Sequence, residues 1–161
     1  MIELRRNKPF SREYVAKENG TVVAELSRAI WRRRAEMNCQ GHTLRLKRQG
    51  AAKSTYALRD GDATIAEVEK PSVLRSRLAF RYGGNDFEIV DKAWYSQKLL
   101  VKSGGSVVGS IRRRGVFASG ALVDLPDDLP LALRVFVGWI GMVRWDDEAS
   151  AAVAGAAVAC G

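Results

Sequence analysis

The segment DDLPLALRVFVGWIGMVRWDDE, from Asp127 to Glu148, is the most apolar stretch of this 161-residue chain. Its large apolar residues, between Leu131 and Val143, cover every side of a helical wheel rather than one stripe. A helix that is hydrophobic all round is buried on all sides. Asp127 and Pro130 are typical of the start of a helix. The sequence therefore predicts a buried helix over about 130–145.

The length of this segment distinguishes a core helix from a membrane span. Pro130 to Trp145 is 16 residues, which makes a helix roughly 24 Å long at ~1.5 Å per residue. A bilayer core of ~30 Å usually needs about 20 residues, and Arg134 would lie inside it. A barrel of short strands has a comparable height. We therefore expect a core helix and no transmembrane span.

The chain before this segment has the pattern of a meandering antiparallel sheet. Many short runs alternate apolar and polar residues, which is the period of a half-buried strand, and glycine-containing turns separate them. About a dozen strands are predicted, over residues 2–6, 11–17, 21–27, 32–39, 42–48, 54–60, 63–69, 76–82, 86–91, 97–103, 106–113 and 118–125.

Three parts of this sheet resemble one another. Tyr14–Leu26 matches Tyr56–Val68, and Leu99–Ile111 is a weaker third copy, with offsets of 42 and 43 residues. Three copies are fewer than the ~4–8 blades of a propeller, whereas closing the sheet into a barrel hides its edges. A barrel of about twelve strands is too wide for side chains alone to fill, so the apolar helix is expected inside it.

The predicted fold is therefore mainly β: a closed antiparallel barrel of about twelve strands around a central hydrophobic C-terminal helix. It forms a single domain over residues 1–147. The Ala-rich tail, 148–161, is either a helical extension or a frayed terminus.

The charge of the chain is concentrated in its first third. Residues 1–60 hold 14 Lys and Arg against 6 Asp and Glu, and the rest of the chain is balanced, within a formal net charge of +8. This asymmetry indicates one basic face with an anionic partner, either a lipid or a nucleic acid; a device for solubility is the alternative. The residues predicted to bind lipid headgroups are Arg28, Arg32, Arg33, Arg34, Arg45, Lys47 and Arg48. Arg5, Arg6 and Arg12 belong to a wider basic set in the same part of the chain.

Other chemistry has little support in the sequence. No secretory h-region opens the chain, and two cysteines make no disulfide framework, so a cytoplasmic protein is expected. Cys39 and His42 could form a nucleophile–base pair, but no third group is visible to orient them. Asp127 and Asp128 are interpreted as helix-start residues rather than metal ligands. We predict no catalytic residue, no metal and no cofactor.

The order of these parts resembles the tubby C-terminal-like superfamily, which includes tubby domains, phospholipid scramblases and LURP-one-related proteins. The resemblance is carried by the strand pairs GTVVAEL and ATIAEV, then VDLPDDLP, then LRVFVGWIGMVRW, between about Ile2 and Trp145. It implies a barrel threaded by a hydrophobic helix. Because tubby domains bind phosphoinositides through basic residues, it also implies a basic surface that faces lipid.

We therefore expect a non-enzymatic tubby-like domain, cytoplasmic and peripheral at the membrane, that binds anionic phospholipid headgroups. No tubby lipid-binding motif or acidic calcium motif matches residue by residue, so scramblase activity is not carried over. A nucleic-acid-binding domain, or a protein-interaction scaffold with no small ligand, is the alternative.

Overall fold

The computed structural model describes residues 1–9, 11–30, 33–50, 54–71, 77–93, 96–115 and 120–159, with the side chains of 28–30 and 157–159 left out. It contains twelve strands followed by one helix. Their bounds are β1 (Ile2–Arg6), β2 (Glu13–Glu18), β3 (Thr21–Ile30), β4 (Arg34–Cys39), β5 (His42–Gln49), β6 (Thr55–Asp60), β7 (Ala63–Glu69), β8 (Leu78–Tyr82), β9 (Asn85–Asp91), β10 (Lys98–Ser103), β11 (Ser106–Arg113), β12 (Gly120–Asp124) and α1 (Leu131–Ala159).

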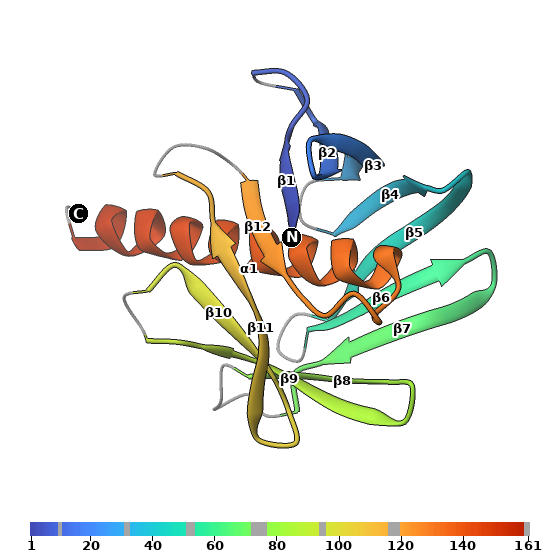
Figure 1. Cartoon of the computed structure of the whole chain (residues 1–161). Helices are drawn as coiled ribbons and strands as arrows, with labels where there is room; N and C mark the ends of the chain where they lie inside the picture. Colours follow the sequence, from blue (N-terminus) through green and yellow to red (C-terminus); the bar gives the residue numbers. More distant parts are fainter. Residues whose placement is uncertain are drawn as a thin grey trace.

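The strands form one closed antiparallel barrel (Figure 1). Each strand pairs with its neighbours in the sequence, and β1 closes the barrel by pairing with both β2 and β12. Closure gives every strand a neighbour on both sides, although among the described residues β7 and β8 pair only at Val68 with Phe80 and Glu69 with Ala79. A closed sheet offers fewer edges to another chain than an open one. The predicted fold class is confirmed, and each of the twelve predicted strands overlaps one observed strand.

The first half of α1 fills the interior of the barrel. From Leu133 to Val143 every residue is buried, so this part of the helix meets the wall on all sides. Trp139 is packed between two aromatic rings, at 6.2 Å from Phe136 and 6.0 Å edge-on from Tyr56 of β6. Such a wide barrel needs an apolar filling, and the helix supplies it.

A glycine lets the helix approach the wall closely. A Cβ atom built on Gly138 would lie 2.5 Å from Val123 Cγ2 of β12 and 2.6 Å from Leu4 Cδ1 of β1. Glycine is a poor helix former, so its presence here is explained by this contact. At this point the helix therefore lies directly against β1 and β12.

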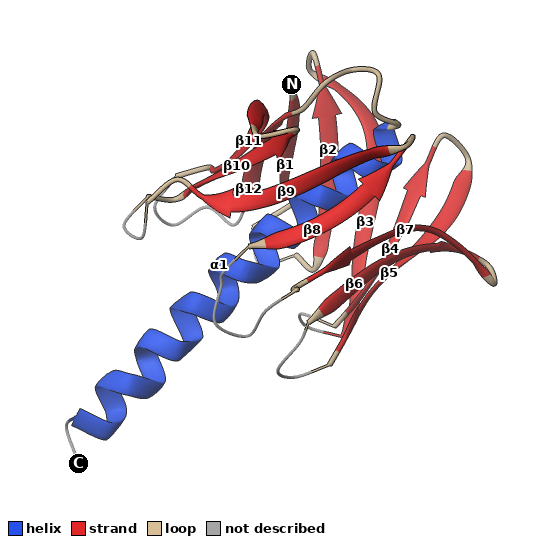
Figure 2. Ribbon diagram, turned by 90° about the horizontal axis from the view of Figure 1, so that it is seen from below, coloured by secondary structure: helices blue, strands red, loops and turns tan. Residues whose placement is uncertain are grey.

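The helix is longer than the sequence indicated. It begins at Leu131, one residue after the predicted start, but it continues to Ala159 instead of ending near Trp145. Figure 2 shows its second half extending beyond the barrel. Ala is the best helix former, and adding residues to an existing helix costs no new nucleation. Most of the predicted 148–161 tail is therefore helical extension.

The sequence repeat has a counterpart in the sheet. A β-bulge interrupts the β2–β3 pair after Ala16, the β6–β7 pair after Leu58 and the β10–β11 pair after Val101. These positions are separated by the same 42 and 43 residues as the sequence copies. The barrel is thus built from three similar four-stranded parts, β2–β5, β6–β9 and β10–β12, the last completed by β1.

Candidate anion-binding groove

A groove of about 470 Å³ lies on the outside of the barrel, over β4, β5 and β6. Strand alternation explains its lining, because Ala35 and Leu46 point to the core while their neighbours point outward. The groove is lined by Arg34, Ala35, Glu36, Arg45, Leu46, Lys47, Arg59, Gly61 and Asp62. It thus gathers four cations and two carboxylates, and its volume falls in the range of small-ligand sites.

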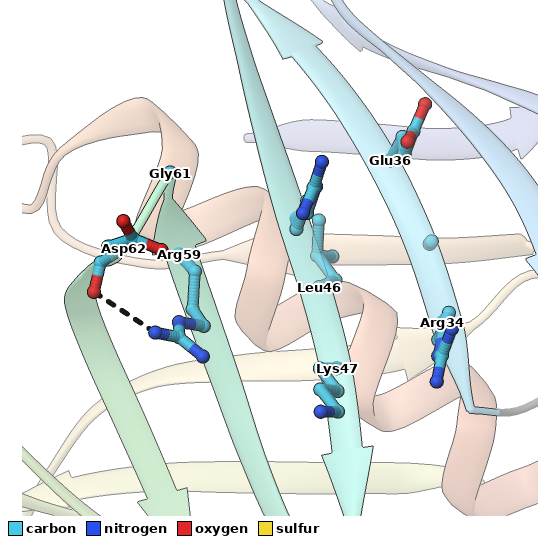
Figure 3. Close-up of a pocket in the computed structure, with 9 residues that line it drawn as sticks. Arg34, Glu36, Leu46, Lys47, Arg59, Gly61 and Asp62 are labelled. Carbon is cyan, nitrogen blue, oxygen red and sulfur yellow. Dashed lines mark hydrogen bonds between the residues drawn. The ribbon is translucent and has the colours of Figure 1, made fainter.

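The register of the strands brings the cations together. Arg34 lies opposite Lys47 across β4 and β5, and Arg45 lies opposite Arg59 across β5 and β6. Directly opposite residues in a sheet are close neighbours, and like charges in that arrangement are destabilising. Figure 3 shows the labelled Arg34, Lys47 and Arg59 on three adjacent strands. An anion bound between them would relieve this repulsion.

Few of these cations are satisfied within the protein. Arg59 donates a hydrogen bond from Nη2 to the main-chain oxygen of Asp62 at 3.0 Å, and its Nε is buried without a described partner. Glu36 lies opposite Arg45 in the register. Nevertheless, within the described part of the chain, Arg34, Arg45 and Lys47 form no ion pair within 4.0 Å. Three cations therefore remain available to a ligand.

Only part of the predicted set of binding residues meets in this groove. Arg34, Arg45 and Lys47 do. Arg32 and the side chain of Arg28 lie outside the described residues. Arg33 is exposed, but it does not line the groove.

Arg48 has a different place. It follows Lys47 in β5, and strand alternation turns it to the inside of the barrel. There Nη1 donates to Asp147 Oδ2 of α1 at 2.6 Å, Nη2 and Nε donate to Ser54 Oγ, and the guanidinium lies 5.8 Å from the Tyr56 ring. Arg48 therefore holds the helix, and its predicted role in headgroup binding is not supported by this geometry.

Sequence reasoning missed Arg59. Its run, TYALRD, shows one arginine beside an aspartate, which looks like an ordinary turn flank. The signal that could have found it was the pairing of neighbouring strands, because β5 and β6 are consecutive and the outward positions of one face those of the other.

The Cys39 and His42 pair has no sign of catalytic activation. Cys39 is buried, and burial raises the pKa of its thiol. A nucleophilic cysteine instead needs a lowered pKa, because the thiolate is the reactive form. The two residues face each other at the end of the β4–β5 hairpin, and His42 is exposed.

Asp127, which precedes the helix, serves the fold. Asp127 Oδ1 accepts a hydrogen bond from Arg134 Nη1 at 2.9 Å, and Glu18 accepts another from the same atom at 3.0 Å.

In the portion of the chain that the structure describes, no group of three or more His, Cys, Asp or Glu residues could hold a metal ion. Nor does any helix among the described residues have the length and apolarity to cross a membrane.

Comparisons of the chain with protein-family models, with curated proteins and with solved structures give no match. The functional interpretation therefore depends on the geometry of the groove.

Proposed function

We propose that this chain is a non-enzymatic, tubby-like domain that binds anionic phospholipid headgroups at the cytoplasmic surface of a membrane. The observation that carries this proposal is the set of cations in the groove, Arg34, Arg45 and Lys47, without an ion-pair partner among the described residues. A closed barrel around a C-terminal helix is compatible with the resemblance to the tubby-like superfamily.

The strength of the interaction follows from the number of charges. Each Lys or Arg near an anionic membrane surface contributes about 1 kcal/mol. Four cations would therefore give about 4 kcal/mol, equivalent to a dissociation constant near 1 mM. Binding of this kind is weak and reversible, and it weakens as salt is added because the groove is open to solvent.

The same cations could bind nucleic acid, but one feature of the groove favours lipid. Proteins that bind single strands combine basic residues with aromatic side chains on which bases stack. None of the nine residues that line the groove is aromatic. A phosphate on a lipid headgroup needs only the cations, so the lipid is the better match.

Co-sedimentation with phosphatidylcholine vesicles, prepared with and without phosphatidylserine, tests the proposal. We expect binding only to vesicles that contain phosphatidylserine. The triple variant Arg34→Ala, Arg45→Ala and Lys47→Ala should bind them about a hundredfold more weakly, because three contributions of about 1 kcal/mol are lost.

A matched control removes the same number of charges outside the groove. Lys8, Lys92 and Arg112 are exposed and do not line the groove, so their triple replacement by Ala should change binding much less. Equal losses in the two triple variants, or equal pelleting with neutral vesicles, would contradict the proposal. Tighter binding to single-stranded RNA than to the vesicles would favour a nucleic-acid partner instead.

A further inference from the structure

The three-strand arrangement under the groove occurs three times in the barrel. The groove lies on β4, β5 and β6. The corresponding strands are β8, β9 and β10 in a second copy, and β12, β1 and β2 in a third. We call these the first, second and third copies. In each, the third strand carries a basic residue directly after the bulge, and these residues are Arg59, Lys102 and Lys17.

The middle strand places one residue opposite each of these cations. Lys102 faces Glu88 of β9, and Lys17 faces Glu3 of β1. In the first copy Arg59 faces Arg45 of β5 instead. This position is thus a glutamate in the second and third copies and an arginine in the first copy.

The two glutamates neutralise cations around them. Glu88 accepts a hydrogen bond from Arg77 Nη1 at 2.9 Å, and Glu3 forms an ion pair with Arg114. Counting back from the β4–β5 and β8–β9 hairpins, Arg34 occupies the place of Arg77. Arg34 forms no ion pair among the described residues, and the position that supplies a carboxylate to Arg77 is here Arg45. The first copy instead carries its glutamate on β4, as Glu36 opposite Arg45.

We propose that Arg45 determines the ligand charge of the groove: the first copy binds anions because this arginine stands where the other copies hold a charge-neutralising glutamate. This inference rests on the proposed function, and it assigns the specificity to one residue. It also explains why cations at equivalent places elsewhere in the barrel, such as Arg77 and Lys102, are not expected to bind the same ligand.

The first test is Arg45→Glu. The introduced carboxylate would lie near Arg34 and opposite Arg59, as Glu88 lies near Arg77 and opposite Lys102. It would also lie opposite Glu36, where the second copy has Ala79. Binding to phosphatidylserine vesicles should fall about thirtyfold, since two units of charge change at about 1 kcal/mol each. The melting temperature should change little, because the introduced carboxylate gains an oppositely charged cross-strand neighbour in Arg59 but a like-charged one in Glu36.

The control is Arg112→Glu, which makes the same change of charge on the exposed surface of β11, on the other side of the closed barrel. It should reduce binding by less than about threefold, since charges more than a Debye length away are largely screened. If the wild-type protein does not bind the vesicles, the proposed function fails. If it binds and Arg45→Glu binds equally well, or no worse than Arg112→Glu, the function stands and the role of Arg45 is overturned.

The second test moves the site. Added to Arg45→Glu, the changes Glu88→Arg and Val90→Lys place cations at the positions in β9 that match Arg45 and Lys47. Arg77 and Lys102 already occupy the positions that match Arg34 and Arg59. Binding should return to within about threefold of the wild type. A folded protein that stays as weak as Arg45→Glu alone would contradict the proposal that the central residue decides anion binding.

Discussion

Lys47 and Arg48 are neighbours in β5, yet they belong to two regions of the molecule in which cations are treated differently. Arg48 points into the barrel and contacts Asp147 of α1 at 2.6 Å. The arginines of the helix are paired in the same way, Arg134 with Glu18 at 3.0 Å and Arg144 with Asp91 at 3.0 Å. Lys47, on the outer face, has no ion pair among the described residues.

This difference separates cations that hold the fold from cations that are free to bind a ligand. A charge in the barrel interior must be paired, because desolvation without a partner costs several kcal/mol. A charge on the outer face stays hydrated, so leaving it unpaired costs little. The ion pairs inside lie toward both ends of the buried part of α1, where they fix its position. Among the groove cations, Arg34, Arg45 and Lys47 form no ion pair with another described residue.

The largest effect is expected from an unpaired charge in the interior. Trp139→Asp removes a fully buried ring and places a carboxylate in the hydrophobic core. We expect a loss of more than about 4 kcal/mol in the free energy of unfolding, enough to unfold the protein. Val153→Asp changes the exposed half of the same helix and should cost under about 0.5 kcal/mol. Circular dichroism and thermal melts check both. A folded Trp139→Asp protein would contradict the placement of the helix.

The next effect concerns a paired charge in the interior. Arg48→Ala leaves Asp147 and Ser54 without this partner and should lower the free energy of unfolding by about 2 kcal/mol; the pair is partly exposed, so the cost is below that of a fully buried one. A double-mutant cycle with Asp147→Asn should show a coupling of about 1 kcal/mol. Lys47→Ala, one residue away, should change stability by less than about 0.5 kcal/mol. Equal losses at positions 47 and 48 would remove the distinction between the two regions.

For lipid binding, unlike for stability, a groove substitution should have a larger effect than an interior one. Arg34→Ala should weaken binding to phosphatidylserine vesicles about fivefold, the equivalent of about 1 kcal/mol. Arg48→Ala, tested below its melting temperature, should leave binding within about twofold of the wild type, because its side chain does not reach the groove. A stronger loss from Arg48→Ala than from Arg34→Ala would show that the headgroup is bound at the mouth of the barrel.

The sequence predicted the fold because its signals were local and consistent. Alternation of apolar and polar residues located the strands, and ATIAEVE and SVVGSIRR match β7 and β11 to the residue. The apolar segment is hydrophobic on every side of the helix, so it had to be buried completely. The helix was predicted to end near residue 145, where the apolar run stops. It continues instead, and Asp147 in the following turn pairs with Arg48.

The groove was predicted less well, because it depends on which residues of different strands face each other. Composition located the basic third of the chain, and alternation separates Lys47 from Arg48 only once the inward side of β5 is known. Strand β5 was predicted, but Lys47 and Arg48 were both included among the binding residues although they lie on opposite faces of the strand. Arg59 was missed because its partner, Arg45, is distant in sequence and close only through the β5–β6 register.

The smallest predicted effect lies at the mouth of the barrel, between the two regions. Glu148 is exposed, but neighbouring atoms partly desolvate its carboxyl and raise its pKa above the ordinary 4.5, and the nearby Arg144 lowers it in part. The folded state therefore binds this proton more tightly than the unfolded state. The stability that protonation contributes is complete below about pH 4.5 and is lost as the pH rises through the folded-state pKa.

Glu148→Gln, which cannot lose a proton, should melt slightly higher than the wild type at pH 7 and equally at pH 4, a difference under about 0.5 kcal/mol. A Glu148→Gln protein less stable at pH 7 than the wild type would mean that Arg144 holds this carboxylate as firmly as the interior ion pairs are held.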